Sequence, residues 1–197
     1  MSLVDIKIDA GLLRVSLNRP EKRNALSGEL IGQLEAVFSQ ASRNEDLRVV
    51  VLSGAGPSFS TGADLAEMAK LDPTAAAQFI RALHRAIHAV MQCPVPVIAA
   101  IRGGCFGGAL ELAAGCDLRI ATNDARFGMP EVKVGIPSVI EAALLPRLIG
   151  RGRAAWMVLT GETITATTAE KWGLVEGLAE PAELQDGAMA LARSILA

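Results

Sequence analysis

Two glutamates occupy positions from which they could carry out acid–base chemistry. Glu111 lies in the first turn of an expected helix, within the apolar stretch "GGALELAAG", and Glu131 follows Pro130 after an expected strand and turn. Burial disfavours the charged form of a carboxyl group and raises its pKa, which keeps a proton available near neutral pH. The alternative is that acidic residues in first helical turns only complement the helix dipole.

Two glycine-containing loops each join an apolar strand to a helix, in "VVVLSGAGPSFSTGADL" and in "PVIAAIRGGCFGGALEL". Each is compatible with an ordinary strand-to-helix turn. Glycines 103, 104, 107 and 108 do not fit the G-x-G-x-x-G dinucleotide pattern, and no Gly-Lys-Ser/Thr triplet marks a P-loop. One backbone N–H from each loop could instead converge on a single oxygen and form an oxyanion hole.

Other reactive residue types give weaker patterns. Ser58 and Ser60 lie in "GPSFST", which is not a G-x-S-x-G nucleophile motif. His84 and His88 are four residues apart on an expected helix, but "HRAIH" has Arg where zinc peptidases have Glu, and no third ligand is evident. We therefore predict no metal site and expect the histidines to lie on a helix surface or an interface.

Strands and helices alternate along the chain, which indicates the α/β class and one domain over residues 1–197. A hairpin is expected around Ala10 and Gly11, and Asp64 is expected to cap a helix in "DLAEMAKL". The other expected elements are strands at 48–54, 96–102 and 116–121, helices starting at 27, 74 and 108, a turn-rich segment at 125–138, and mostly helical sequence thereafter.

Composition excludes several classes of function. The formal net charge of −2, without a basic stripe, argues against nucleic-acid binding, and the apolar runs are too short for a membrane span. Three cysteines form no CxxC pair and are expected to be free thiols in a reducing compartment. The N-terminus lacks the apolar region of a signal peptide, so the expected location is cytoplasmic.

The whole constellation resembles the crotonase superfamily, the enoyl-CoA hydratase/isomerase family. The matching stretches are "LNRPEKRNALS", "FSTGADL", "PVIAAIRGGCFGGALELAAGCDLRIAT", "ARFGMPEVKVGIP" and "LLPRLIGRGRAAWMVLTGETITATTAEKWGLVE". The resemblance implies a crotonase-like ββα spiral fold with a single core domain. Its members continue through further C-terminal helices, so we expect residues 181–197 to begin that helical region and the rest of it to be truncated.

The resemblance also implies roles for four site residues. The N–H groups of Ala63 and Gly108 would bind the thioester oxygen, and Glu111 and Glu131 would be the two catalytic glutamates. The family's double-bond isomerases usually lack a glutamate at the position of Glu111, so the pair favours hydration of a 2-enoyl-CoA. In that reaction Glu111 acts as base on water and Glu131 supplies the proton to C2.

By the same resemblance, the loop 21–25 contacts the coenzyme A part of the substrate, mainly through backbone atoms of Glu21, Arg23 and Ala25. Arg19, Lys22 and Arg23 would attract its phosphates, or they form a solvated charge run. No separate cofactor is implied. The expected partner is the acyl-CoA substrate, and the expected assembly is a homotrimer or a hexamer made of two trimers.

The chain departs from the family where hydratases usually read "IPGAGGTQRL" and this sequence reads "IPSVIEAALLPRL". The segment borders the acyl group in relatives, which makes Ser138 and Glu141 candidate acyl-pocket residues. Glu141 is either a third acidic group of the site or a first-turn helix residue. The alternatives to a hydratase are an isomerase, a thioester hydrolase of the same superfamily, or a catalytically weak CoA-thioester binding protein.

Overall fold

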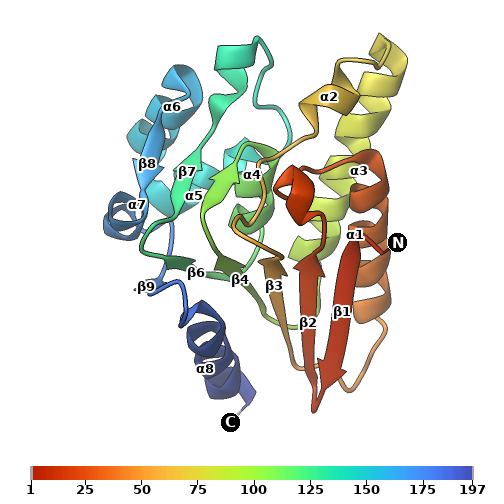
Figure 1. Cartoon of the computed structure of the whole chain (residues 1–197), viewed down its shortest axis with the longest axis vertical. Helices are drawn as coiled ribbons and strands as arrows, with labels where there is room; N and C mark the ends of the chain where they lie inside the picture. Colours follow the sequence, from red (N-terminus) through yellow and green to blue (C-terminus); the bar gives the residue numbers. More distant parts are fainter. Residues whose placement is uncertain (1, 197) are drawn as a thin grey trace.

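The predicted N-terminal hairpin forms one edge of a six-stranded sheet in the computed structural model, which describes residues 2–196 (Figure 1). Strands β1 (Val4–Asp9) and β2 (Leu12–Leu17) pair in antiparallel register. The turn between them places Ala10 and Gly11 at φ values of 46° and 82°. Two consecutive positive φ values characterise the hairpin turn whose twist matches that of the flanking strands.

The whole sheet has the strand order β1-β2-β3-β4-β6-β9. All of its neighbouring strands except β1 and β2 are parallel. The added strands are β3 (Val49–Gly54), β4 (Val97–Ile101), β6 (Leu118–Thr122) and β9 (Gly177–Ala179). The first three were predicted from their apolar runs, and β4 is buried throughout. Because β3 and β4 are parallel neighbours, the two glycine-containing loops leave the sheet side by side at its carboxyl edge.

Two long helices cover one face of the sheet, as Figure 1 shows. Helix α1 (Gly28–Ala41) begins at Ser27, whose hydroxyl accepts a hydrogen bond from the N–H of Leu30, as the predicted helix start requires. Helix α3 (Pro73–Met91) packs along α1 and buries Phe79, Leu83, Ile87 and Val90 on one stripe. Together with the sheet they enclose the larger hydrophobic core.

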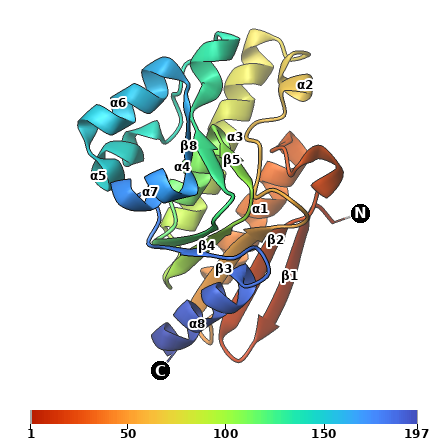
Figure 2. The same cartoon turned by 60° about the vertical axis from the view of Figure 1, so that its left-hand side comes forward.

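Helix α8 (Leu184–Leu196) lies on the opposite face, against β3, β4 and β6. In Figures 1 and 2 it is drawn in dark blue at the lower end of the molecule, apart from the other helices. It closes a second, smaller core, whose buried members are Leu12, Val49, Val51, Ile98, Ala100, Leu184, Ala188 and Ala192.

Several short elements complete the fold. A second sheet has the order β5-β7-β8, formed by Gly104–Phe106, Arg126–Gly128 and Thr163–Thr165. The remaining helices are α2 (Leu65–Met68), α4 (Gly108–Ala114), α5 (Leu145–Ile149), α6 (Arg151–Thr160), α7 (Ala166–Trp172) and the 3-10 helices η1 (Pro20–Lys22), η2 (Pro130–Val134) and η3 (Ala142–Leu144).

Two sequence expectations differ from this structure. The expected helix after Asp64 spans only the four residues of α2, and the largely helical C-terminal part also contains the strands β8 and β9. Strands of three residues are too short to show the alternation by which strands are recognised. Within residues 2–196, no helix combines the length and apolar character needed to cross a membrane.

Candidate active site

The two glycine-containing loops are joined by backbone hydrogen bonds. The N–H of Phe59 donates to the carbonyl of Arg102 at 2.6 Å, and the N–H of Ser60 donates to that of Gly104 at 3.1 Å. In the other direction, the N–H of Phe106 donates to the carbonyl of Ser60 at 3.3 Å. The loops therefore run together as far as the residues that precede α2 and α4.

Ala63 and Gly108 lie at the end of this contact and line the same cavity. Leu26 bonds to both neighbours of Ala63, accepting from the N–H of Asp64 at 3.0 Å and donating to the carbonyl of Gly62 at 2.8 Å. The N–H of Ala63 thus points away from Leu26, and within residues 2–196 it has no acceptor. If Gly62, the residue before Ala63, carried a Cβ, that atom would lie 3.5 Å from the nitrogen of Gly108. Gly108 is the first residue of α4, so its N–H has no partner within the helix.

Glu111 is buried in the first turn of α4, with 1% of the residue exposed. Its Oε1 accepts a hydrogen bond of 3.0 Å from the backbone N–H of Glu141, and its Oε2 would lie 3.9 Å from a Cβ at Gly108. Burial raises the pKa of Glu111 to about 7; the Glu141 N–H opposes this change, and the negative charge of Glu131 adds to it. Glu111 therefore changes its protonation state near neutral pH.

Glu131 approaches the same turn from the other side, on η2. A Cβ at Gly107 would lie only 2.6 Å from its Oε1, so the glycine leaves room for the carboxyl group. Its Oε2 is buried and has no hydrogen-bond partner among residues 2–196, and burial raises the pKa of this carboxyl as well. An unsatisfied buried carboxyl oxygen is costly, which suits a group that meets a ligand or a water at this point.

Both glutamates line a cavity of about 100 Å³. Ala63, Gly108 and Ser138 also line it, so the structure brings the predicted oxyanion and acid–base residues and one predicted acyl-pocket residue together. The rest of the wall is mainly apolar and includes the side chains of Leu65, Met68, Ile80, Leu83, Val134, Ile136, Pro137, Val139 and Ile140. In Figures 1 and 2, α2, the first turns of α3 and the segment after β7 lie at the upper end of the molecule.

Glu141 lies next to this cavity without lining it. Its carboxylate contacts Nδ1 of His84 on α3 at 2.6 Å, and its backbone N–H bonds to Glu111. His84 is on the helix surface, as predicted, with its ring stacked on that of His88. Within the described residues, no three His, Cys, Asp or Glu side chains gather closely enough to hold a metal ion.

The predicted coenzyme A loop lies outside the cavity, against the loop that carries Ala63. Glu21 and Arg23 are exposed and Ala25 is half-buried. The carbonyl of Arg23 accepts from the N–H of Thr61 at 3.2 Å, which ties the two loops together. Arg23 therefore borders the first glycine loop.

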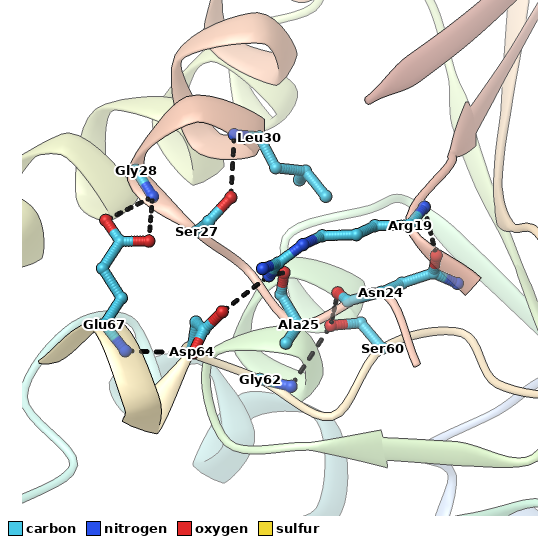
Figure 3. Close-up of polar contacts among 10 residues, drawn as sticks. All are labelled: Arg19, Asn24, Ala25, Ser27, Gly28, Leu30, Ser60, Gly62, Asp64 and Glu67. Atoms are coloured by element: carbon cyan, nitrogen blue, oxygen red, sulfur yellow. Dashed lines mark hydrogen bonds and ion pairs between the residues drawn. The ribbon is translucent and has the colours of Figure 1, made fainter. Parts of the chain in front are cut away.

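Arg19 is engaged within this loop pair, so its guanidinium group is less available for phosphates than the exposed Lys22 and Arg23. Its Nη1 donates to Asp64 Oδ2 at 2.7 Å and to the carbonyl of Ala25 at 3.0 Å (Figure 3). The Arg19 guanidinium lowers the pKa of Asp64. Asp64 also caps α2, as predicted, by accepting from the N–H of Glu67.

Two further residues hold these loops and were not predicted from the sequence. Asn24, at φ 55°, accepts from the N–H of Arg19 and donates through Nδ2 to the carbonyls of Ala55, Ser58 and Phe59. The Glu67 carboxylate accepts from the N–H of Gly28 at 3.1 and 3.3 Å (Figure 3). For Asn24 the sequence did offer a signal, namely an Asn in a tight polar loop. Such a residue can mark a turn, because Asn is one of the few residues that tolerate the left-handed region.

Comparison with known proteins is consistent with this geometry. The model of the family described as enoyl-CoA hydratase/isomerase matches residues 7–197. The chain is 39% identical to (E)-benzylidenesuccinyl-CoA hydratase of Thauera aromatica, over 98% of this chain and 75% of that protein. It is 36% identical to the short-chain-enoyl-CoA hydratase of Clostridium acetobutylicum, over 92% of this chain and 70% of the relative.

The fold matches a solved structure of the same kind. The crystal structure of an enoyl-CoA hydratase from Bacillus anthracis superimposes with a TM-score of 0.96 and 35% sequence identity. The superposition covers 99% of this chain and 77% of the crystallised one.

Proposed function

The chain belongs to the enoyl-CoA hydratase/isomerase family, and from that premise we propose that it adds water across the 2,3 double bond of an enoyl-CoA thioester. The observation that carries the proposal is the pair Glu111 and Glu131. Both carboxyl groups have raised pKa values, and both line one small cavity beside two N–H groups that lack internal acceptors. Relatives named as hydratases support the same reaction.

The N–H groups of Ala63 and Gly108 bind the thioester oxygen in this proposal. When water adds to C3, negative charge develops on that oxygen as an enolate forms. Backbone donors fixed by the paired loops stabilise this charge without having to reorganise, and the loss of one such donor typically costs about 3–4 kcal/mol of transition-state stabilisation. Gly108 suits this position because it presents no side chain to the substrate.

Glu111 and Glu131 divide the proton transfers between them. Glu111, with a pKa of about 7, is basic enough to take a proton from water as the water oxygen bonds to C3. Glu131, whose pKa burial also raises, donates a proton to C2. Water thus contributes a hydroxyl at C3 and a hydrogen at C2, and exchange of protons with solvent restores both carboxyl groups.

The apolar wall of the cavity receives the acyl group, while the loop 21–25 meets the coenzyme A part of the substrate. Leu65, Val134 and Val139 line the cavity and are each more than half exposed, so they form an apolar rim. Lys22 and Arg23 are exposed cations on the adjoining loop and suit the phosphates of coenzyme A.

Hydration of crotonyl-CoA, followed by the loss of enoyl absorbance, tests the proposal. We predict that Glu111→Gln and Glu131→Gln each lower kcat at least 100-fold, the usual contribution of a general acid or base, with little change in thermal stability near pH 5. Glu35→Gln, which alters a surface glutamate paired with Arg85, is the matched control and should retain full activity.

Three results would contradict the proposal. One is a wild-type protein that binds crotonyl-CoA without hydrating it. Another is undiminished hydration by either glutamine variant. The third is faster isomerisation of a 3-enoyl-CoA than hydration of the 2-enoyl-CoA.

A further inference from the structure

The segment between η2 and η3 holds one oxygen of Glu111. The backbone N–H of Glu141 donates to Oε1 of Glu111 at 3.0 Å, while Oε2 faces the Gly108 turn. The two oxygens of this carboxyl group therefore differ: Oε1 is held by a backbone N–H, and Oε2 is on the side of the Gly108 turn.

This segment has few backbone attachments of its own. Residues 137–140 form no helix or strand, and the N–H groups of 138–140 donate to no backbone carbonyl within residues 2–196. Its apolar attachment comes from Ile140 and Ala142, which pack against the main core. Segments with so few backbone hydrogen bonds are the ones that fluctuate most easily, so a side-chain anchor has a large effect here.

The side chain of Glu141 provides such an anchor. Its Oε1 contacts Nδ1 of His84 at 2.6 Å, and its side chain is only 14% exposed. His84 lies on α3, a helix of 19 residues whose neighbouring side chain Leu83 packs beneath Gly108. The contact therefore links Glu141, at the end of a segment with few backbone hydrogen bonds, to the long helix α3.

We propose that Glu141 and His84 are positioning residues for Glu111: their contact holds the Glu141 N–H on Oε1, so that Oε2 is presented to the water that adds to the substrate. The role in water activation rests on the proposed hydratase function. An ordinary surface ion pair, which contributes little, is the alternative.

Kinetics on crotonyl-CoA test the catalytic part of the proposal. His84→Ala and Glu141→Ala should each lower kcat about tenfold, because a reacting group that is slightly misplaced loses much of its effect, while KM stays within about twofold. The double variant should be no slower than the slower single variant, since both changes break the same contact. Glu141→Gln should recover most of kcat, because its amide oxygen can still accept from His84.

Arg85→Ala is the matched control because it breaks an exposed ion pair, to Glu35 at 3.1 Å, one residue along the same helix. It should leave kcat and KM unchanged. A rise in KM with unchanged kcat in the His84 and Glu141 variants would assign the pair to substrate binding and overturn the proposal. Unchanged kcat in both would overturn it as well.

Infrared titration of ¹³C-glutamate-labelled protein tests the positioning without any turnover. The carboxyl band that disappears in Glu111→Gln belongs to Glu111. His84→Ala should raise its apparent pKa by about 0.5 to 1 pH unit, because the N–H that favours the charged form is displaced. The charged groups facing Glu111 are Glu131 on η2 and Glu141 before η3, and this variant removes neither carboxylate.

The two experiments separate the two proposals. Wild-type protein that shows no hydration overturns the hydratase assignment, and the titration still decides whether His84 and Glu141 position Glu111. A Glu111 band that titrates identically in wild type and His84→Ala overturns the positioning pair, whatever the activity of the wild type.

Discussion

At the scale of the residue, Glu111 shows how the site is made reactive at the expense of stability. The carboxyl group is almost fully buried, no cation lies among the groups that shift its pKa, and its strongest compensating contact is a single backbone N–H. The folded protein therefore binds this proton more tightly than the unfolded chain does. A carboxyl group with a raised pKa lowers the stability of the fold once the pH is high enough to ionise it.

The sign and window of this effect follow from the pKa. The ordinary value is 4.5 and the folded value is about 7, so the penalty is absent below pH 4.5 and complete above about pH 8. Glu111→Gln should therefore raise the free energy of unfolding relative to wild type by up to about 3 kcal/mol at pH 8, with the difference vanishing near pH 4.5.

Urea unfolding of both proteins across this pH range measures the difference. A gap between variant and wild type that is constant with pH would mean that Glu111 is not a buried carboxyl with a raised pKa. A gap that widens as the pH falls would contradict the sign of the argument.

At the scale of the element, the first glycine loop is held by side chains from the preceding loop. Asn24 is the centre of this attachment, because its one amide reaches three carbonyls across the loop pair and accepts from Arg19. Ser60 adds a bond from its hydroxyl to the carbonyl of Asn24 at 2.7 Å. The position of the Ala63 N–H depends on this network, although none of these side chains lines the cavity.

Replacing Asn24 by glycine tests this attachment while keeping the positive φ available. We predict a loss of about 2–4 kcal/mol in the free energy of unfolding, because buried carbonyls of Ser58 and Phe59 lose their donor. We also predict a lower kcat for hydration, measured on the folded fraction. Ala10→Gly, at another non-glycine turn position with positive φ, is the control and should be neutral or slightly stabilising.

A stability loss without any change in kcat would show that Asn24 supports the fold alone. Unchanged stability would contradict the hydrogen-bond assignment itself.

The sequence predicted the elements that position the site and missed the contacts that fix it. Strands at 48–54 and 96–102 were predicted, each followed by a glycine-containing loop. The structure shows that these strands are parallel neighbours, which brings the two loops together. The contact of His84 with Glu141 joins residues 57 positions apart and has no periodic signal. The strands β7 to β9 are stabilised by pairing with distant partners, which propensity alone does not register.

At the scale of the whole molecule, the sheet separates two cores. The larger core, under α1 and α3, supports the cavity, while the smaller one lies between the sheet and α8. Because the proposed catalytic residues all lie on loops and helices of the first side, damage to the second core should weaken the fold without reshaping the site.

Ala188→Asp tests this separation by placing a carboxylate in the smaller core, where Ala188 is fully buried. We predict a loss of about 3 kcal/mol in the free energy of unfolding, since a buried charge without a partner is strongly unfavourable, with kcat per folded molecule unchanged. Ala190→Asp introduces the same charge on the exposed face of α8 and should change stability by less than about 0.5 kcal/mol. Equal effects of the two substitutions in urea unfolding would contradict the placement of α8.

The central claim is that the N–H groups of Ala63 and Gly108 share the thioester oxygen of a substrate whose C2 and C3 lie beside Glu111 and Glu131. Its most direct measurement is the infrared stretch of the thioester carbonyl in crotonyl-CoA, ¹³C-labelled at C1 and bound to the turnover-deficient Glu111→Gln variant. Two donors on one oxygen polarise the carbonyl, so the account predicts a stretching frequency clearly lower than in water. A frequency equal to that of free crotonyl-CoA, with binding verified independently, would contradict the claim.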